Sequence, residues 1–191
     1  MNKIIGIFGM QGAIAEHQEI LLQIPHTKTR IVKTAKDLDC IDGLILPGGE
    51  STAIGKLLDY FSLKEILRQK IISGLPVFGT CAGLILLAKN IENQTNTHLA
   101  TMDITVKRNG YGSQLDSFST NLLIPTIDKN MPIPLVFIRA PYITKTDKDV
   151  QILATLDNKI IAARQKNMLV SSFHPELTCD LRFHQYFLSM I

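Results

Sequence analysis

The sequence predicts a three-layer α/β/α domain with a mostly parallel sheet and some antiparallel additions. In the first half of the chain, short apolar segments alternate with segments of helical spacing, which is typical of a parallel sheet covered on both faces. From about Asp103 the pattern changes to shorter alternating runs, which favour antiparallel strands. With 191 residues, 46% of them hydrophobic, the chain can bury one large core, so we expect one domain over residues 1–191.

The first half provides the predicted parallel strands and the helices between them. Apolar or β-branched runs predict strands at Lys3–Phe8, Thr29–Val32, Gly43–Leu46 and Leu75–Gly79. Helical spacing predicts helices at Gly12–Ile24, Ser51–Tyr60, Leu63–Ile72 and Ala82–Lys89. Ser51 or Thr52, and Ser62, are placed to cap two of these helices. Ligands of such sheets gather above the carboxyl ends of the parallel strands.

The second half provides the shorter strands and a closing helix. The predicted strands are Ile104–Val106, Leu122–Ile124, Leu135–Ile138, Ile152–Leu156, Ile160–Ala163 and Met168–Phe173. Asp157 and Asn158 stand between two of these runs and predict the turn of an antiparallel hairpin. An amphipathic helix is expected at Asp180–Met190.

Composition excludes several classes of function. The net charge is +3 and the 20 lysines and arginines are scattered, so no nucleic-acid partner is expected. The longest apolar run contains proline and glycine and is too short for a bilayer, and no export signal is expected. The cysteines (Cys40, Cys81 and Cys179) show no CxxC spacing, so neither a disulfide framework nor a metal site is expected. These features favour a reducing cytoplasm.

One cysteine lies at a predicted strand-to-helix turn, in the segment Gly79–Gly83. Such a turn lifts Cys81 above the sheet edge and requires small neighbours because the backbone bends sharply. The first amides of the helix point at the sulfur and favour its thiolate form. The pattern by itself fits a buried cysteine in a helix-packing turn equally well.

A glycine pair follows the strand before this cysteine, in the segment Leu46–Thr52. Paired glycines at a helix start let backbone amides face a ligand and favour developing negative charge. The segment is not a P-loop, because no lysine precedes Ser51 and Thr52. A plain tight turn with a helix cap would use the same residues.

A histidine and a carboxylate stand close together near the end of the chain, in Ser171–Glu176. Pro175 should keep this tip extended, so that the Glu176 carboxylate, two residues on, reaches the His174 ring. A nucleophile, a base and a carboxylate that orients the base are the minimum set for covalent acyl transfer. Four other histidines lack such a neighbour and are expected to be ordinary polar surface residues: His17, His26, His98 and His184.

Three further features have an ordinary structural interpretation as well as a functional one. Gly6, Gly9 and Gly12 have G-x-x-G-x-x-G spacing instead of a dinucleotide fingerprint, so NAD binding is not expected. Arg108 lies in a glycine-containing loop and could hold a carboxylate. Arg139 ends a predicted strand, and by itself this position favours a solvated arginine over a ligand contact.

In order along the chain, these motifs resemble a known family. The matching segments are Gly9–Ala13, Leu46–Thr52, Gly79–Gly83, Arg108–Asn109, Asp116–Phe118, Phe137–Pro141 and Ser172–Leu177. They resemble the glutaminase subunits of pyridoxal 5′-phosphate synthase, which are class I (triad) glutamine amidotransferases, over essentially the whole chain. The resemblance implies a flavodoxin-like fold of the class I glutamine amidotransferase type. Gly110 and Tyr111 depart from the usual Ser-Phe, and the C-terminal tail is short.

The resemblance also implies roles for particular residues. Cys81 would be the nucleophile, His174 the base and Glu176 its orienting partner. Glutamine would be bound by Gly49, Glu50, Ser51, Arg108, Ile138 and Arg139. Backbone amides of Gly48, Gly49 and Ala82 would form the oxyanion hole. No cofactor is expected.

The function implied is hydrolysis of L-glutamine to L-glutamate and ammonia through a cysteine thioester. The ammonia would pass to a (β/α)₈-barrel synthase subunit in a large hetero-oligomer, for pyridoxal 5′-phosphate (vitamin B6) biosynthesis. One alternative is a triad glutaminase of another pathway, against which the Glu50–Thr52 continuation of the loop argues. Another is a non-enzymatic stress or sensor protein with a cysteine elbow, but those usually place a histidine where this chain has Ala82.

Overall fold

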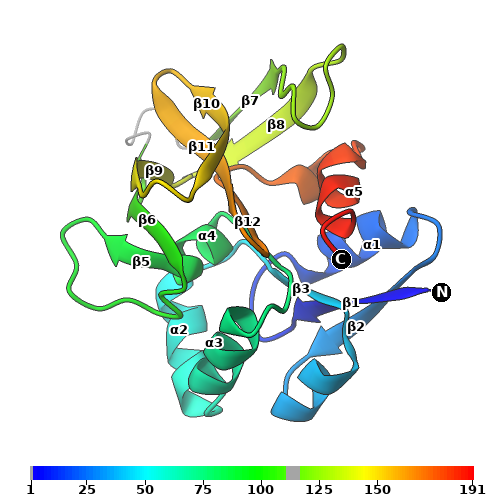
Figure 1. Cartoon of the computed structure of the whole chain (residues 1–191), viewed down its shortest axis with the longest axis vertical. Helices are drawn as coiled ribbons and strands as arrows, with labels where there is room; N and C mark the ends of the chain where they lie inside the picture. Colours follow the sequence, from blue (N-terminus) through cyan, green and yellow to red (C-terminus); the bar gives the residue numbers. More distant parts are fainter. Residues whose placement is uncertain (1, 111–116) are drawn as a thin grey trace.

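The structure, a computed structural model, describes residues 2–110 and 117–191 and has a long mixed sheet at its centre (Figure 1). The strand order is β2-β1-β3-β4-β12-β11-β9-β6-β5, and β10 pairs with β11. The strands of this sheet are β1 Lys3–Phe8, β2 Thr27–Val32, β3 Gly43–Leu46, β4 Val77–Thr80, β5 Ala88–Ile91, β6 Met102–Lys107, β9 Tyr142–Thr146, β10 Gln151–Leu156, β11 Lys159–Gln165 and β12 Met168–Ser171. The strands β7 Ser117–Leu122 and β8 Ile133–Ile138 form a separate antiparallel pair.

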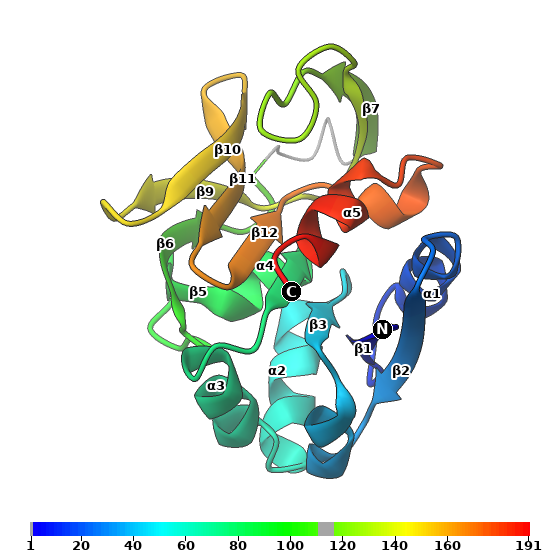
Figure 2. The same ribbon diagram turned by 45° about the vertical axis from the view of Figure 1, so that its right-hand side comes forward.

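Helices cover both faces of the sheet. They are α1 Ile14–Leu22, α2 Ser51–Tyr60, α3 Lys64–Ile72, α4 Ala82–Leu87 and α5 Arg182–Leu188, with short 3₁₀ helices η1 Ala35–Cys40 and η2 Pro175–Leu177. Figures 1 and 2 show α2 and α3 on one side of the β1–β4 strands, and α1 with α5 on the other. The predicted α/β fold class with a mostly parallel sheet is therefore confirmed.

The alternation of buried side chains along the central strands explains the three layers. Leu44 and Leu46 face the apolar core shared with α2 and α3, whereas Ile45 faces the core shared with α1 and α5. On the neighbouring strand, Val77 and Phe78 divide between the two cores in the same way. Because successive side chains of a strand point to opposite faces, a continuous apolar run requires burial on both sides.

The parallel strands set the position of the site. Strands β3, β4 and β12 are neighbours and run parallel, with β3 paired to β4 and β4 paired to β12. Their carboxyl ends therefore meet at one edge of the sheet, where the loop after Leu46, the turn at Cys81 and the segment after Ser171 all begin.

Several local expectations need correction. The hairpin at Asp157 and Asn158 is confirmed, since both residues have positive φ and join β10 to β11. The strand expected at Leu122–Ile124 lies earlier, at β7, because the alternating residues from Ser117 on pair with β8. Strands β5 and β9 and helix η1 were not predicted.

The capping residues also differ from the expectation. The N-cap of α2 is Glu50, whose carboxylate accepts a hydrogen bond from the Ala53 amide at 2.7 Å, and Ser51 is already helical. The N-cap of α3 is Leu63, which makes no side-chain capping bond, so Ser62 does not cap that helix.

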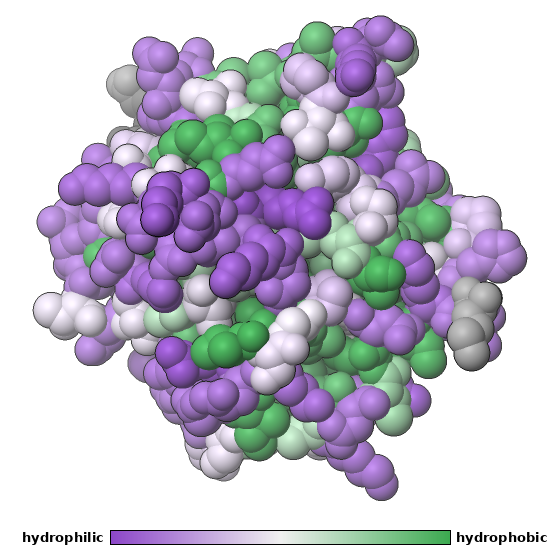
Figure 3. Space-filling model, viewed as in Figure 1, coloured by the Kyte–Doolittle hydropathy of each residue, from purple (hydrophilic) through white to green (hydrophobic). Residues whose placement is uncertain are grey.

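The surface has no large apolar face in the view shown. Figure 3 shows hydrophilic side chains gathered over the region of β5, β6 and β9, with apolar side chains in separate smaller patches. Within the described parts of the chain, no helix has the length and apolar character needed to cross a bilayer.

Candidate active site

Cys81 occupies a strained turn between β4 and α4. Its φ is 47° and its ψ is −97°, in a region that residues other than glycine rarely adopt, and the cost of order 1–3 kcal/mol must be met by the surrounding fold. The Cys81 amide donates to the Ser171 carbonyl at 2.8 Å, which ties the turn to the end of β12. A Cβ on Gly83 would lie 2.1 Å from the Leu46 carbonyl oxygen, so a glycine is needed where α4 passes β3.

His174 and Glu176 follow β12 at the same edge of the sheet. The His174 amide donates to the Val136 carbonyl at 2.8 Å, and its ring Nδ1 lies 2.8 Å from Glu176 Oε1. Contrary to the expectation of an extended tip, Pro175 begins the 3₁₀ helix η2, and this turn brings Glu176 back to the ring. The pair forms as expected, although by another backbone route.

The electrostatics of this group favour a charged imidazole. Burial acts against the charged form of His174, but its hydrogen bonds with Cys81 and Glu176 raise the imidazole pKa to about 10. Burial likewise acts to raise the pKa of Glu176, but the facing imidazoles of His17 and His174 outweigh it, so this carboxyl pKa lies below its usual value. The His174 imidazole therefore lies between the Cys81 sulfur and the Glu176 carboxylate, in surroundings that favour its protonated form.

The glycine loop lies against this histidine. A Cβ on Gly48 would lie 2.4 Å from His174 Cε1 and 3.5 Å from Cys81 Cβ. The Gly48 amide donates to Thr80 Oγ1 at 3.0 Å, and its carbonyl accepts from the Ala13 amide at 3.0 Å. In this conformation the Gly48 N–H is thus engaged by Thr80.

A cavity of about 360 Å³ opens above Cys81 and His174. It is lined by Gln11, Gly49, Glu50, Ser51, Cys81, Ile85, Arg108, Asn109, Ile138, Arg139, Pro141 and His174. All six residues expected to bind glutamine are in this lining, together with the nucleophile and base candidates. Four lining residues were not predicted as site residues: Gln11, Ile85, Asn109 and Pro141. Three of them, Gln11, Asn109 and Pro141, lie within the matching motifs. Ile85 could have been expected only from its position one turn after Cys81 on the predicted helix.

Two arginines of the cavity differ in their surroundings. Arg108 donates to Glu50 Oε1 at 2.9 Å and to Thr52 Oγ1 at 3.2 Å, so its charge is compensated. Arg139 makes no hydrogen bond or ion pair with other described residues and has a positive φ of 43°. Tyr111 and Asp116, which belong to the matched loop and its departure from the family pattern, lie outside the described residues.

The expectation that His17 and His184 are surface residues is wrong. Both are fully buried, and their rings lie beneath the site, with His17 Nδ1 3.0 Å from His184 Nε2. Sequence spacing contained a signal for this burial: each histidine is followed by two apolar residues at i+3 and i+4, Ile20 and Leu21 for His17. His26 is exposed and His98 half-buried.

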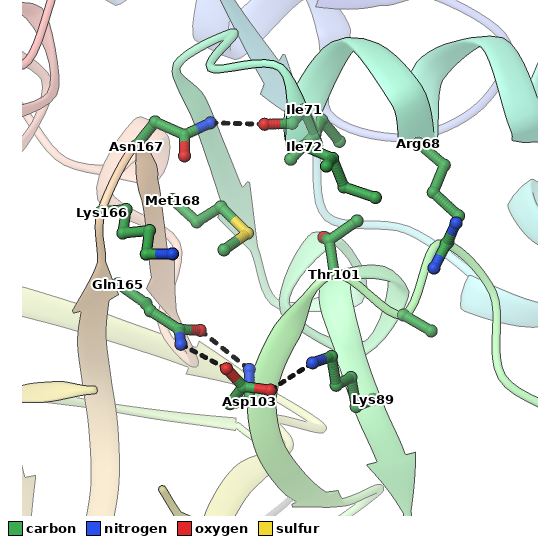
Figure 4. Close-up of a pocket in the computed structure, with 11 residues that line it drawn as sticks. Arg68, Ile71, Ile72, Lys89, Thr101, Asp103, Gln165, Lys166, Asn167 and Met168 are labelled. Atoms are coloured by element: carbon green, nitrogen blue, oxygen red, sulfur yellow. Dashed lines mark hydrogen bonds and ion pairs between the residues drawn. The ribbon is translucent and has the colours of Figure 1, made fainter. Parts of the chain in front are cut away.

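A second cavity, of about 290 Å³, lies away from these residues, between the end of α3 and the β11–β12 turn (Figure 4). Asp103 there pairs with Lys89 and with the side chain of Gln165, so much of its polar lining is already satisfied. None of its lining residues is a cysteine or histidine. Among the described residues, no group of three or more His, Cys, Asp or Glu side chains could hold a metal ion.

Comparisons with solved structures and with known families identify this fold. A crystal structure described as a glutamine amidotransferase superposes with a TM-score of 0.90 at 38% identity, covering 97% of each chain. The fold of the chain is thus that of a glutamine amidotransferase.

The chain belongs to the SNO glutamine amidotransferase family, whose model matches residues 7–191. It is 53% identical to the pyridoxal 5′-phosphate synthase subunit PdxT of Ruminiclostridium cellulolyticum, covering 99% of this chain and 100% of that protein. It is 54% identical to the protein of the same name from Carboxydothermus hydrogenoformans, covering 98% and 97%.

Proposed function

We propose that this chain hydrolyses L-glutamine to L-glutamate and ammonia, with Cys81 as nucleophile, and supplies the ammonia to a pyridoxal 5′-phosphate synthase. The observation that carries the proposal is the line of contacts from Cys81 to His174 to Glu176 at the floor of a cavity of about 360 Å³. Residues 1–191 would act as one glutaminase domain. The reaction needs a reduced thiol, which fits a reducing cytoplasm and three unpaired cysteines.

The first half-reaction forms a thioester. With the thiol proton of Cys81 transferred to His174, the Cys81 thiolate attacks the carboxamide carbon of glutamine, and the C=O electron pair moves to the oxygen. Backbone amides of Gly49 and Ala82 would stabilise this oxyanion, joined by that of Gly48 once it leaves Thr80. The His174 imidazolium gives its proton to the departing nitrogen, and the C–N bond breaks as ammonia leaves.

The second half-reaction releases glutamate. His174, now neutral, takes a proton from water, and the hydroxide attacks the thioester carbon. The C–S bond breaks, Cys81 departs as a thiolate and His174 is again an imidazolium. Glu176 holds the ring through Nδ1 in both steps, so that the other ring nitrogen stays directed at the reacting atoms.

Charge around the cavity supports an amino acid as substrate. An α-carboxylate requires a cation, and Arg139 and Arg108 both line the cavity. Glu50 Oε1 and the Ile138 backbone are the available acceptors for an α-amine. We infer that these residues with Gly49 and Ser51 bind glutamine.

The partner proposed is a (β/α)₈-barrel synthase subunit in a large hetero-oligomer. Support comes from the names of the two relatives above, which are subunits of pyridoxal 5′-phosphate synthase. The same names favour this pathway over another ammonia-consuming one, and family membership argues against a non-enzymatic sensor.

The test is a steady-state ammonia assay on the chain alone and with the synthase subunit. Cys81→Ala should remove glutamine hydrolysis, whereas Cys179→Ala, at an exposed cysteine, should retain it. A diazo-ketone analogue of glutamine should label Cys81 and spare Cys40 and Cys179 by peptide mass mapping. Glutaminase activity that survives Cys81→Ala would refute the proposal.

A further inference from the structure

The catalytic carboxylate has one oxygen that the proposed mechanism does not use. Glu176 Oε1 contacts His174, whereas Oε2 is buried and makes no hydrogen bond of good geometry. The nitrogen that faces it is His17 Nε2, 3.5 Å away, and both side chains are fully buried. Since a buried carboxylate oxygen without a donor is costly, the contact with His17 calls for explanation.

The neighbours of His17 determine which ring nitrogen carries its proton. Nε2 faces Glu176 Oε2 and also lies 3.2 Å from Thr80 Oγ1, while Nδ1 lies 3.0 Å from His184 Nε2. A proton on Nδ1 would turn a lone pair of Nε2 toward the carboxylate. A proton on Nε2 lets His17 donate toward Glu176 and Thr80 and accept from His184 Nε2–H.

The protonation of the two buried imidazoles is consistent with this arrangement. Burial lowers the pKa of His17, against the opposing charge of Glu176, and burial lowers that of His184 well below its usual value, so both rings favour the neutral form with one N–H. His184 Nδ1 has no hydrogen-bond partner among the described residues and is then a lone pair near the aromatic ring of Phe78.

Thr80 connects the same imidazole to the glycine loop. Its Oγ1 contacts His17 Nε2 and accepts from the Gly48 amide at 3.0 Å. His17 therefore contacts both the carboxylate that orients the base and the hydroxyl that holds the peptide above it.

We propose that His17 is a positioning residue for glutamine hydrolysis, whose Nε2–H fixes the Glu176 carboxylate and the Thr80 hydroxyl and thereby orients both His174 and the Gly48 peptide. The inference rests on the proposed function. His17 is not among the residues that line the cavity above Cys81, so it acts through Glu176 and Thr80.

The decisive comparison is between two substitutions of His17. Leu removes the donor at similar size, whereas the side-chain amide of Gln places an N–H where Nε2 stands. We expect His17→Leu to lower kcat roughly 10- to 100-fold with KM nearly unchanged, because a misplaced base slows chemistry more than binding. His17→Gln should recover most of that loss.

His184→Gln is the matched control. It also replaces a fully buried imidazole, in ring contact with Phe78, but its side-chain amide N–H can still donate to His17 Nδ1, so the His17 Nε2–H stays in place. It should keep kcat within about threefold of the unchanged chain, with folding of every variant checked by circular dichroism and thermal unfolding.

The pH profile separates positioning from packing. The titratable groups facing Glu176 are His17 and His174; those facing His17 are Glu176, His174, His184 and Glu16. Loss of the N–H donor raises the Glu176 pKa, so the acidic limb of kcat/KM should move to higher pH in His17→Leu and return in His17→Gln. A packing defect would lower the amount of folded protein without moving that limb.

The proton position is measured directly by two-bond ¹H–¹⁵N NMR of the histidine rings in Cys81→Ala, which needs no variant of His17. The expected signature is an Nε2–H tautomer for His17 and for His184. An Nδ1–H tautomer of His17, equal losses in His17→Leu and His184→Gln, or unchanged kcat in His17→Leu would overturn the inference. If the unchanged chain with its synthase produces no ammonia from glutamine, the proposed function itself fails.

Discussion

The two halves of the cavity are built differently. The half with Cys81, His174 and Glu176 is nearly closed to solvent, with exposed fractions of 8%, 7% and 6%, and begins at the ends of β4 and β12. The half with Arg108, Ile138 and Arg139 lies at the end of β8 and in the segments that follow β6 and β8, and Ile138 is 38% exposed. The buried half holds the groups proposed to react, and the more exposed half presents the charges proposed to bind the substrate.

The largest effect is expected from breaking the buried half. His174→Asn should lower kcat roughly 10²–10⁴-fold, because the proton donor and base of both half-reactions is lost. Glu176→Gln should lower it less, since the imidazole remains but is held less well. His98→Asn, at a half-buried histidine outside the cavity lining, is the control. Normal kcat in His174→Asn would remove the basis of the comparison.

A smaller but still large effect is expected where the glycine loop meets the buried half. Gly48→Ala puts a Cβ where His174 Cε1 lies 2.4 Å away, so the ring must shift. We expect kcat to fall roughly 10²-fold with a smaller change in KM. Gly43→Ala, at the other end of β3, provides the control, because the atoms nearest to a Cβ there belong to the side chains of Ile191 and Phe187 and not to the site. Equal kinetics for the two variants would show that Gly48 is not constrained by the histidine.

The exposed half should respond in KM. Arg139→Ala is expected to raise KM for glutamine roughly tenfold with little change in kcat, since a charged hydrogen bond to the substrate is lost. Arg108→Ala should raise KM less, because Glu50 already neutralises that guanidinium. Lys107→Ala, an exposed cation next to Arg108 but outside the cavity lining, should leave KM unchanged. A loss confined to kcat in Arg139→Ala would mean that both halves serve chemistry.

The smallest effect concerns the support of the exposed half in acid. Arg182 on α5 donates to Asp128 Oδ2 at 2.8 Å and to the Met131 carbonyl at 2.9 Å, just before β8. Hydrogen bonds from the amides of Asn130 and Met131 and from Arg182 lower the pKa of Asp128 to about 2.

A carboxyl whose pKa is lowered by folding stabilises the fold above its unfolded pKa of about 3.9 and loses that contribution as pH falls toward 2. Asp128→Asn should therefore flatten the dependence of Tm on pH between about 4 and 2 and leave Tm near pH 7 only slightly lower. Calorimetry over this range checks it, and identical acid dependence in both proteins would contradict it.

Sequence patterns predicted much of the buried half because its residues follow strong local rules. The Gly79–Gly83 elbow and the apolar β3 and β4 runs require a covered sheet with a turn at its edge. Family resemblance then supplied Arg108, Ile138 and Arg139, whose exposed loops carry no such pattern.

What could not be predicted depends on contacts between distant parts of the chain. By sequence alone, Glu50, Ser51 and Thr52 are all candidates for the N-cap of α2. Glu50 takes that position, and its carboxylate is also held by a hydrogen bond from Arg108, 58 residues away. His17 and Thr80 stand 63 residues apart, so nothing in their neighbours signals the contact. Strand β5 follows α4 without a turn residue, which made the two look like one helix.

The backbone angles of Cys81 lower the stability of the fold at a residue that the proposed activity requires. A residue with φ of 47° and ψ of −97° gives up part of the folding free energy, and glycine would occupy the same angles without that penalty. Cys81→Gly would then be an inactive protein that resists unfolding better than the active one. With Cys81 as the proposed nucleophile, selection for glutamine hydrolysis opposes a substitution that relieves this strain, and a lineage freed from that demand would have a stabilising route to losing this cysteine.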